Sequence, residues 1–359
     1  MSFKTLTRQW IWLLSFVVLA LTACNKDDDT QPADTFGPGI FIVNEGPFQN
    51  GTGSISFWDR QSDVVLQSIY FGLNGEDLGN IAQSMTIANG QAFIVVNNAG
   101  KVVAADAATF MKNGEITGLS LPRYMVALEG TSTAFVSQWG ATGTDGSVAV
   151  VNTDNYTVTS TIPTGSGAET MLLVGDELWV ANSGGFGRDS TISIIDVNSL
   201  AIKETIVVGD NPNSLVQDSD GNIWVICAGY AHNFDPNDPL STPGKLVRIS
   251  NKTISKTFEL PNDAGRLIIN SQGNRLFYLD SRYGGRVFDF FTNQPQLNTT
   301  PFLDGTWYSL GYDPVENTVL AGNAGDFSSP GSMTVVDATG NMVREVMTGI
   351  IPTFFVVRE

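Results

Sequence analysis

The chain has 359 residues, with 36 acidic and 19 basic side chains and a net charge of −17 at pH 7. Such an acidic surface repels phosphate backbones, so nucleic acid is not expected as a partner, and it suits solubility at a cell surface. The length exceeds that of a typical single domain, although repeat-built β folds of this size are common.

The first 23 residues have the pattern of a signal peptide. Lys4 and Arg8 give a positive start, and residues 10–21 form an apolar run too short for a comfortable membrane span. Small residues then lead to a cysteine in Leu21-Thr22-Ala23-Cys24. This ending resembles the bacterial lipobox, which implies cleavage before Cys24 and acylation of its thiol and its new amine. The alternative is an ordinary secreted protein with a chance cysteine at this position.

Residues 24–38 are predicted to be a solvated tether. The charge run Asn25-Lys26-Asp27-Asp28-Asp29 cannot enter a core, and a linker rich in Pro, Gly and Thr follows it. The charge run resembles the export signal of Bacteroidetes surface lipoproteins. That resemblance implies an outer-membrane protein, lipid-anchored, facing the cell exterior and touching the membrane only through its lipid. A periplasmic-facing location stays open.

From residue 39 onward, four short β-rich runs recur in a fixed order. The pattern is clearest in residues 168–209, where Gly175-Asp176 and Val197-Asn198-Ser199 separate strand-like runs. The first run of each unit recurs at spacings of 40 to 52 residues, centred on Met85, Met125, Met171, Leu215, Leu267, Leu310 and Phe355. This period, with four strands per unit, predicts one all-β domain over residues 39–359, a seven-bladed β-propeller without an amphipathic helix.

The two ends of the repeat array predict how the ring closes. Residues 40–46 form a second-type run with no first run before it, and residues 352–359 form a lone first-type run. The C-terminal strand should therefore pair into the N-terminal blade and complete it. This closure removes an exposed sheet edge.

Part of the repeat resembles a known propeller family. Blade four reads Leu178-Trp-Val-Ala-Asn-Ser-Gly-Gly, Thr191-Ile-Ser-Ile-Ile-Asp and Thr205-Ile-Val-Val-Gly-Asp-Asn-Pro212, which is similar to the YVTN/YncE-type repeat. Residues 39–46 also resemble Bacteroidetes surface lipoproteins of this class. Some of those relatives capture corrinoids (vitamin B12 and its precursors) and pass them to a TonB-dependent outer-membrane transporter, while others have no known ligand. The resemblance implies a corrinoid-type ligand and such a transporter as partners.

Residues suited to catalysis are scarce. The single histidine, His232, lies in a long insertion (residues 229–244), where an ordinary loop residue, a ligand contact and an axial ligand to a metal-bearing guest all stay open. Asp235, Asn237 and Asp238 lack the spacing of a known calcium loop, although calcium binding there stays open. With Cys24 acylated, Cys227 is the one remaining thiol and is expected to be buried and inert. The chain is expected to hold no cofactor and not to be an enzyme.

One face of the propeller is predicted to bind a ligand. The loops between second and third runs should open on that face, and the starts of the first runs should line the channel mouth there. Aromatic side chains among amides and arginines suit a large, flat, hydrogen-bonding ligand. The expected ligand-binding residues are Asn44, Gln83, Asn97, Arg123, Trp139, Asn182, Phe186, Tyr230, His232, Arg266, Tyr283 and Trp307. The alternative is that strand-end polar residues solvate loops and that the two tryptophans pack between blades.

The sequence is consistent with three alternative functions. The first is a monomeric surface protein that captures a corrinoid or another bulky nutrient beside a transporter. The second is a propeller lactonase or hydrolase, which is disfavoured because Glu169 is the one carboxylate expected to point inward. The third is a protein-interaction or adhesion module with no small ligand, for which the acidic surface and the tether are equally adequate.

Overall fold

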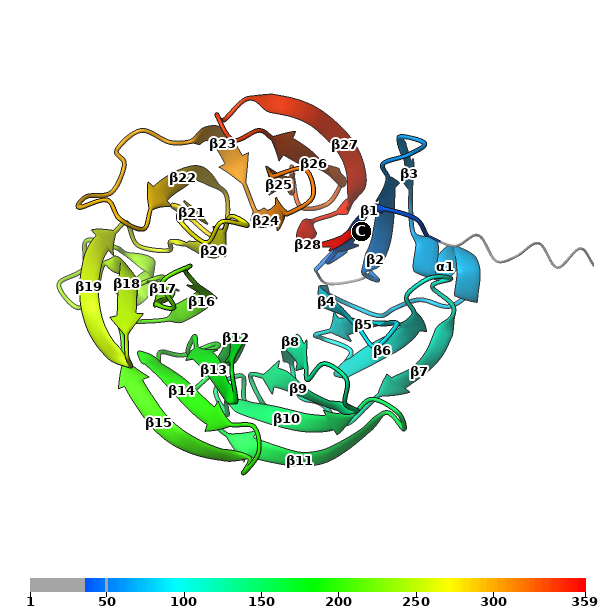
Figure 1. Ribbon diagram of the computed structural model, residues 1–359, viewed down its shortest axis with the longest axis horizontal. Coiled ribbons are helices and arrows are strands. Elements are labelled where there is room, and N and C mark those ends of the chain that lie inside the picture. Colours follow the sequence, from blue (N-terminus) through cyan, green and yellow to red (C-terminus); the bar gives the residue numbers. More distant parts are fainter. Residues whose placement is uncertain (1–35, 49–50) are drawn as a thin grey trace, which may run out of the picture. The chain divides into compact units, whose positions relative to one another are not determined.

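The computed structural model describes residues 36–48 and 51–359. The predicted signal peptide, Cys24 and nearly all of the predicted tether lie outside the described residues. The described chain forms seven four-stranded antiparallel sheets around a central axis (Figure 1). The predicted seven-bladed β-propeller is confirmed. Within the described part of the chain, no helix has the length and apolar character needed to cross a bilayer.

Within each blade the four strands follow one another outward from the axis. Blades 1 to 4 consist of β28 (Pro352–Arg358), β1 (Gly39–Asn44), β2 (Ser54–Asp59) and β3 (Val64–Leu66); β4 (Ala82–Ala88), β5 (Gln91–Val96), β6 (Lys101–Asp106) and β7 (Lys112–Ile116); β8 (Pro122–Ala127), β9 (Thr133–Gln138), β10 (Ser147–Asn152) and β11 (Thr157–Pro163); and β12 (Ala168–Val174), β13 (Glu177–Asn182), β14 (Thr191–Asp196) and β15 (Ala201–Val207). Blades 5 to 7 consist of β16 (Pro212–Gln217), β17 (Ile223–Cys227), β18 (Gly244–Ser250) and β19 (Thr253–Leu260); β20 (Gly265–Ile269), β21 (Arg275–Leu279), β22 (Gly285–Phe291) and β23 (Leu303–Trp307); and β24 (Ser309–Asp313), β25 (Thr318–Asn323), β26 (Pro330–Val336) and β27 (Met342–Ile350).

The last strand of the chain closes the ring, as predicted. β28 pairs antiparallel with β1, with Ile42 opposite Phe355. Arg60 of blade 1 also forms an ion pair with Asp313 of blade 7, and both side chains are largely buried. The blade that joins the two ends is therefore held to blade 7 by an ion pair in addition to the pairing of β28 with β1.

The hydrophobic core is divided into seven clusters, one at each interface between neighbouring blades. Second strands are buried on both faces because each sheet packs between two others, and they are rich in β-branched and aromatic residues. The outer strand β15 is mostly exposed and carries Lys203 and Glu204, which protect a sheet edge. Cys227 lies in the cluster between blades 4 and 5, and burial raises the pKa of its thiol, as expected of an inert cysteine.

A short helix was not predicted from the sequence. α1 (Ile69–Asn74) lies between β3 and β4, and η1 (His232–Phe234) is a single 3₁₀ turn in the blade 5 insertion. α1 buries Ile69 and Tyr70, and it ends at Gly75, whose φ of 68° is left-handed and whose N–H donates to the carbonyl of Phe71. Six residues are too few to show a helical period, so the prediction of no helix was wrong at this point.

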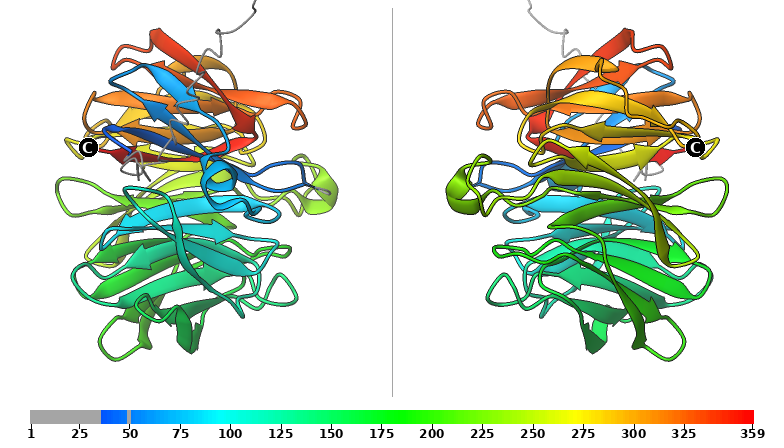
Figure 2. Two further views of the ribbon diagram at one scale, coloured as in Figure 1. Left: turned by 90° about the vertical axis from the view of Figure 1, so that its right-hand side faces the viewer. Right: turned by 90° about the vertical axis from the view of Figure 1, so that its left-hand side faces the viewer.

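All loops between second and third strands open on one side of the propeller, which we call the loop face. Figure 2 shows three of these loops, in blue (after β1), yellow-green (after β17) and orange (after β25), projecting on the same side. The inner strands begin at this face, because each chain path through a blade repeats the last. The tertiary structure therefore brings together the strand starts and loops that the sequence assigned to one face.

Candidate ligand-binding face

A β-bulge recurs near the start of the inner strands, next to the loop face. Six of the seven inner strands shift register there against their second strands, and β24 is the exception. A bulge sets two residues opposite one and re-aims a side chain. A polar residue lies at every shift: Gln83, Arg123, Glu169, Asn213, Arg266 and Thr353.

A charged network around Arg123 joins blades 2 to 4. Its guanidinium donates two hydrogen bonds to the carboxylate of Glu169, at 2.9 and 3.0 Å, and a third to Oε1 of Gln83. Trp139 donates from Nε1 to the same carboxylate at 2.6 Å, and its ring centroid lies 4.3 Å from the guanidinium. Burial alone lowers the pKa of Arg123, but the charge and hydrogen bonds of Glu169 outweigh it and raise the pKa above its usual value. Arg123 therefore stays charged.

Glu169→Gln is expected to lower the free energy of unfolding by about 2 kcal/mol. Removing one partner of a buried ion pair costs about 3–5 kcal/mol, and less is expected here because the Arg123 and Glu169 side chains are 15% and 8% exposed. Urea denaturation measures the loss. Asp63→Asn is the matched control, since Asp63 and its partner Arg344 are 51% and 38% exposed, and it should cost under about 1 kcal/mol. Equal losses in the two variants would contradict a special role for the Arg123 network.

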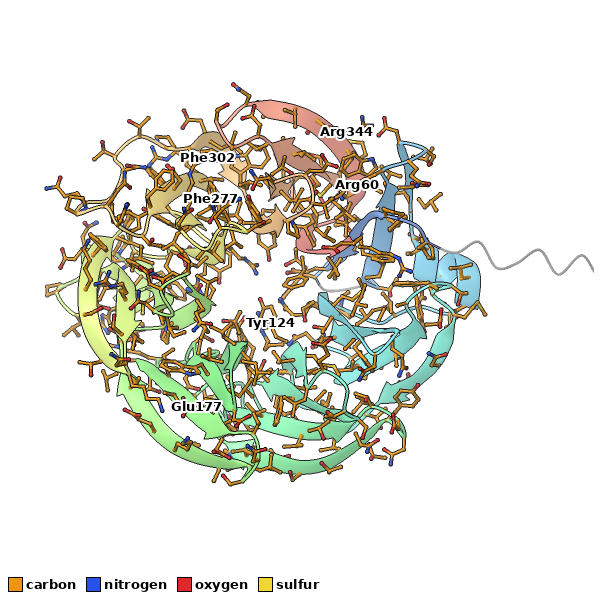
Figure 3. The ribbon with its side chains drawn as sticks, in the orientation of Figure 1. Arg60, Tyr124, Glu177, Phe277, Phe302 and Arg344 are labelled. Carbon is orange, nitrogen blue, oxygen red and sulfur yellow. The ribbon has the colours of Figure 1, made fainter. Side chains whose placement is uncertain are left out.

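A second cluster spans the axis. Arg266 of blade 6 reaches toward Tyr124 of blade 3, whose hydroxyl lies 3.4 Å from Nη1, and Figure 3 shows Tyr124 extending into the axial space. The Arg266 guanidinium lies 5.4 Å from the ring centroid of Tyr308, and Tyr308 donates from its hydroxyl to the Glu45 carboxylate at 3.1 Å. Burial raises the pKa of both tyrosines, so their hydroxyls remain protonated. The cluster brings together side chains of blades 1, 3, 6 and 7.

Exposed aromatic side chains gather on the loop face. Five of its loops each present one, which we call the loop aromatics: Phe48, Phe186, Phe234, Tyr283 and Phe327, between 42% and 98% exposed. In the rest of the described chain, only Phe71 and Phe291 are comparably exposed aromatic residues. Phe186 also packs edge-on against Trp139, at 5.3 Å between ring centroids, which links the loops to the axial network below. Exposed apolar groups gathered on one face are typical of a binding surface.

The long insertion of blade 5 is held to blade 4. Arg188 forms an ion pair with Asp210 at 2.7 Å, and its guanidinium lies 4.7 Å from the ring centroid of Tyr230. His232 Nδ1 lies 3.1 Å from a carboxylate oxygen of Asp238, and the histidine side chain is 31% exposed. Tyr230 and His232 thus lie on the loop face, as the sequence suggested, within a segment that is fastened at its base.

Three expected ligand-binding residues are turned into the fold. Asn44 and Asn182 are fully buried at the ends of second strands, and each donates at 3.0 Å to a serine of the third strand. Asn97 donates at 2.9 Å to the carbonyl of Pro122. These amides fasten strands beneath the loop face, because a buried polar group must find an internal partner.

Trp307 lies away from the axis. It ends the outermost strand of blade 6, is 6% exposed and packs in the cluster between blades 6 and 7, so the structure supports the alternative in which this tryptophan packs between blades. The next residue, Tyr308, occupies the axial space instead, and Tyr124 does so beside Arg123. Both tyrosines adjoin inner-strand starts, which is the signal that would have found them. Sequence reasoning named their neighbours Arg123 and Trp307 instead, because the sequence does not fix which residues at a strand start turn toward the axis.

A protein-family model described as Domain of unknown function (DUF5074) matches residues 38–343. The chain belongs to the DUF5074 family. A search of curated proteins finds no match. Among solved structures, a quinonprotein alcohol dehydrogenase-like protein from Bacteroides thetaiotaomicron is 15% identical, with a TM-score of 0.67 over 90% of this chain and 79% of its own. A periplasmic gluconolactonase from Pseudomonas aeruginosa is 14% identical, with a TM-score of 0.64 over 89% and 99%. At these identities the likeness shows the fold alone.

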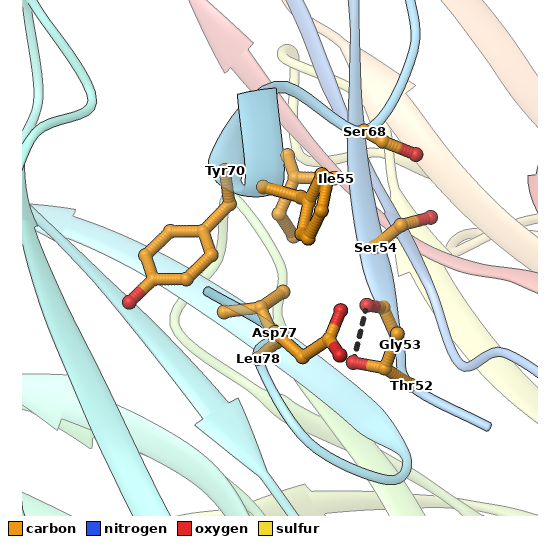
Figure 4. A pocket seen from close by; sticks show the side chains of 9 residues that line it. Thr52, Gly53, Ser54, Ile55, Ser68, Tyr70, Asp77 and Leu78 are labelled. Atoms are coloured by element: carbon orange, nitrogen blue, oxygen red, sulfur yellow. Dashed lines mark hydrogen bonds between the residues drawn. The ribbon is translucent and has the colours of Figure 1, made fainter. Parts of the chain in front are cut away.

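Two small grooves of the DUF5074 propeller lie between neighbouring blades. One, of about 240 Å³, lies between blades 1 and 2 beside α1, where Tyr70, Asp77 and Leu78 line it together with residues 52–55 (Figure 4). The other, of about 300 Å³, lies between blades 6 and 7 and includes Arg275 and Tyr312. Pockets for drug-sized ligands measure roughly 300–1,000 Å³, so neither groove suits a bulky molecule. Among the described residues, no group of three or more His, Cys, Asp or Glu side chains is placed to hold a metal ion.

Proposed function

We propose that this DUF5074 protein is a monomeric, lipid-anchored surface protein that captures a bulky nutrient on its loop face and passes it to an outer-membrane transporter. Acylation of Cys24 holds it on the exterior of the outer membrane. The ligand class we propose is a corrinoid, because the repeat resembles surface propellers that capture such molecules. The observation that carries the binding role is the gathering of the loop aromatics above a polar axial centre.

The loop aromatics come from five different blades, 1, 4, 5, 6 and 7, and so they are distributed around the axis. A wide ligand can contact several of them at once, whereas a narrow one cannot. Aromatic side chains supply large contact areas at low entropic cost. The guanidinium groups and tyrosine hydroxyls at the centre then supply the few oriented polar contacts that such a site needs.

The arrangement supports binding over hydrolysis. Glu169 at the axial end already accepts two hydrogen bonds from Arg123 and one from the indole of Trp139. A general base needs a free lone pair within hydrogen-bond reach of the proton that it removes. A carboxylate that accepts a bidentate arginine and an indole N–H is better suited to fixing the shape of a site than to abstracting a proton.

Cyanocobalamin titrated into the purified protein, followed by calorimetry, tests the proposal, and saturable binding of one molecule per chain is expected. The double variant Phe186→Ser and Tyr283→Ser should weaken this binding about tenfold or more. Each aromatic contact contributes roughly 0.5–1.5 kcal/mol beyond its area, and 1.4 kcal/mol is tenfold in affinity. The melting temperature should hardly change, because the two side chains are 73% and 70% exposed.

The matched control is Phe291→Ser, which removes an exposed aromatic residue at the end of the third strand β22, on the side opposite the loop face, and should leave binding unchanged. If neither cyanocobalamin nor any other large nutrient binds the unaltered protein, the capture role is wrong. The exposed loop aromatics would then fit a protein partner, and the interaction or adhesion function would be preferred.

A further inference from the structure

Arg266 differs from the other arginine at the axial end. Arg123 donates three hydrogen bonds, to Glu169 and Gln83, whereas Arg266 forms no salt bridge with any described carboxylate within 4.0 Å. Its Nη1 has one long hydrogen bond, 3.4 Å to Tyr124, and its Nε is buried without a partner. A guanidinium carries five N–H donors, so most of the capacity of Arg266 is unused.

Arg266 has a backbone conformation that is unfavourable for a residue other than glycine. Its φ of 59° is left-handed. At the other five bulged inner strands the left-handed residue lies directly before the strand, as at Leu121, so in blade 6 it has moved onto the bulge residue itself. For a non-glycine residue this conformation persists only where the surroundings impose it, and such residues cluster at functional sites. The preceding residue, Gly265, lets the backbone pass close to Arg282 and Asn213. A Cβ at Gly265 would lie 2.5 Å from the Arg282 side chain and 2.8 Å from Asn213.

The groups around Arg266 are suited to holding an anion. The Tyr124 hydroxyl is a protonated donor beside Nη1, and the Tyr308 ring lies 5.4 Å from the guanidinium. The carboxylates of Glu45 and Glu169 are also near enough to act on Arg266 electrostatically. Neither forms a salt bridge with Arg266 within 4.0 Å: Glu45 accepts from the Tyr308 hydroxyl and Glu169 from Arg123.

We propose that Arg266 and the Tyr124 hydroxyl form a subsite for an anionic oxygen group of the captured ligand, a carboxylate or a phosphate. This inference rests on the proposed capture function and names the chemistry that the axial end recognises. The planar fork of an arginine matches two oxygens of either group. The loop aromatics would then hold the apolar body of the ligand while the subsite fixes its orientation.

Benzoate and phenyl phosphate are the probes, with benzamide as the neutral counterpart of similar size. Titration of the purified full chain, followed by protein NMR, should show saturable binding of at least one of the two anions and no comparable binding of benzamide. Arg266→Met should weaken the anion at least tenfold. Arg266→Lys keeps the charge but loses the planar fork of donors, and it should weaken binding of the anion several-fold. If the methionine variant does not fold, the lysine variant tests the subsite in its place.

Arg248→Met is the matched control. Arg248 also lacks a salt bridge among the described residues and also stacks on an aromatic ring, that of Trp224 at 5.9 Å, but it lies on the third strand of blade 5. Its loss should leave anion binding unchanged. Equal binding of benzamide, no binding of either anion, or unchanged affinity in both Arg266 variants would overturn the inference.

The outcomes separate this inference from the proposed function. If cyanocobalamin binds but the anions do not, the subsite is wrong and the capture role stands. If the anions bind through Arg266 while no large nutrient binds, the capture role is wrong and only anion binding at Arg266 stands.

Discussion

Deletion of residues 352–359 is expected to abolish the folded state. The deleted strand β28 supplies the axial strand of blade 1 and contributes Phe354, Phe355, Val356 and Val357 to the clusters on either side. Fully burying such a side chain stabilises by about 1.5–3 kcal/mol; Phe355 is buried and the other three are partly buried, so their sum reaches the lower part of the roughly 5–15 kcal/mol that stabilises a whole domain. Loss of the strand also exposes the edge of β1. Thermal unfolding followed by circular dichroism measures the effect.

Deletion of Glu359 alone is the control, because this residue is exposed and lies beyond β28. It should leave the melting temperature unchanged. A peptide of residues 352–359 added to the truncated protein should restore part of the stability by pairing with β1, as strand addition does elsewhere. A truncated protein that melts at the temperature of the full chain would show that β28 does not close the ring.

Trp307→Ala is expected to lower mainly the stability of the fold, and Trp139→Ala mainly the affinity for the ligand. Trp307 is 6% exposed in the core between blades 6 and 7, so its loss should lower the free energy of unfolding by about 3–5 kcal/mol. Affinity per folded molecule should not change. Trp139 donates to Glu169, stacks on Arg123 and supports Phe186. Its loss should weaken cyanocobalamin binding more than tenfold and should cost only about 2 kcal/mol of stability.

Urea denaturation and calorimetric titration of the same two variants separate these effects. Trp307→Phe is the conservative control, since a smaller aromatic ring fills part of the cavity and should recover part of the stability. A large loss of affinity in Trp307→Ala with unchanged stability would contradict the buried position of this side chain.

The number of blades and the closure of the ring could be predicted because they depend on the repeat spacing and on strand patterns that are visible in the sequence itself. A run of apolar β-branched residues such as β17 pairs with its neighbours in the chain across short turns, and the repeat of 40 to 52 residues counts the blades. The unpaired runs at residues 40–46 and 352–359 have only each other left as partners. Sheet pairing within a blade is local, so the sequence contains nearly all of it.

The site was predicted less completely, for reasons that particular residues show. Phe186, Tyr230 and Tyr283 were correctly placed on the loop face, because the second-to-third-strand loops that carry them lie there. Asn44 and Asn182 lie at the edge of that face, but their amides turn inward to serines on the adjacent strand. An asparagine at a strand end can either contact a ligand or hold two strands together. A serine at the right position on the neighbouring strand selects the second role, and the sequence alone does not show which residues will face each other.

The sequence by itself therefore determined the fold, the ring closure and the face on which the loops gather. Only the tertiary structure decided which side chains reach the axis. A bulge of one residue re-aims the side chains at the start of an inner strand, and a strand boundary off by one exchanges Trp307 for Tyr308. The contact between Tyr124 and Arg266 joins residues 142 positions apart, on blades that are not neighbours. No local pattern encodes that contact, because it exists only once the ring has closed around the axis.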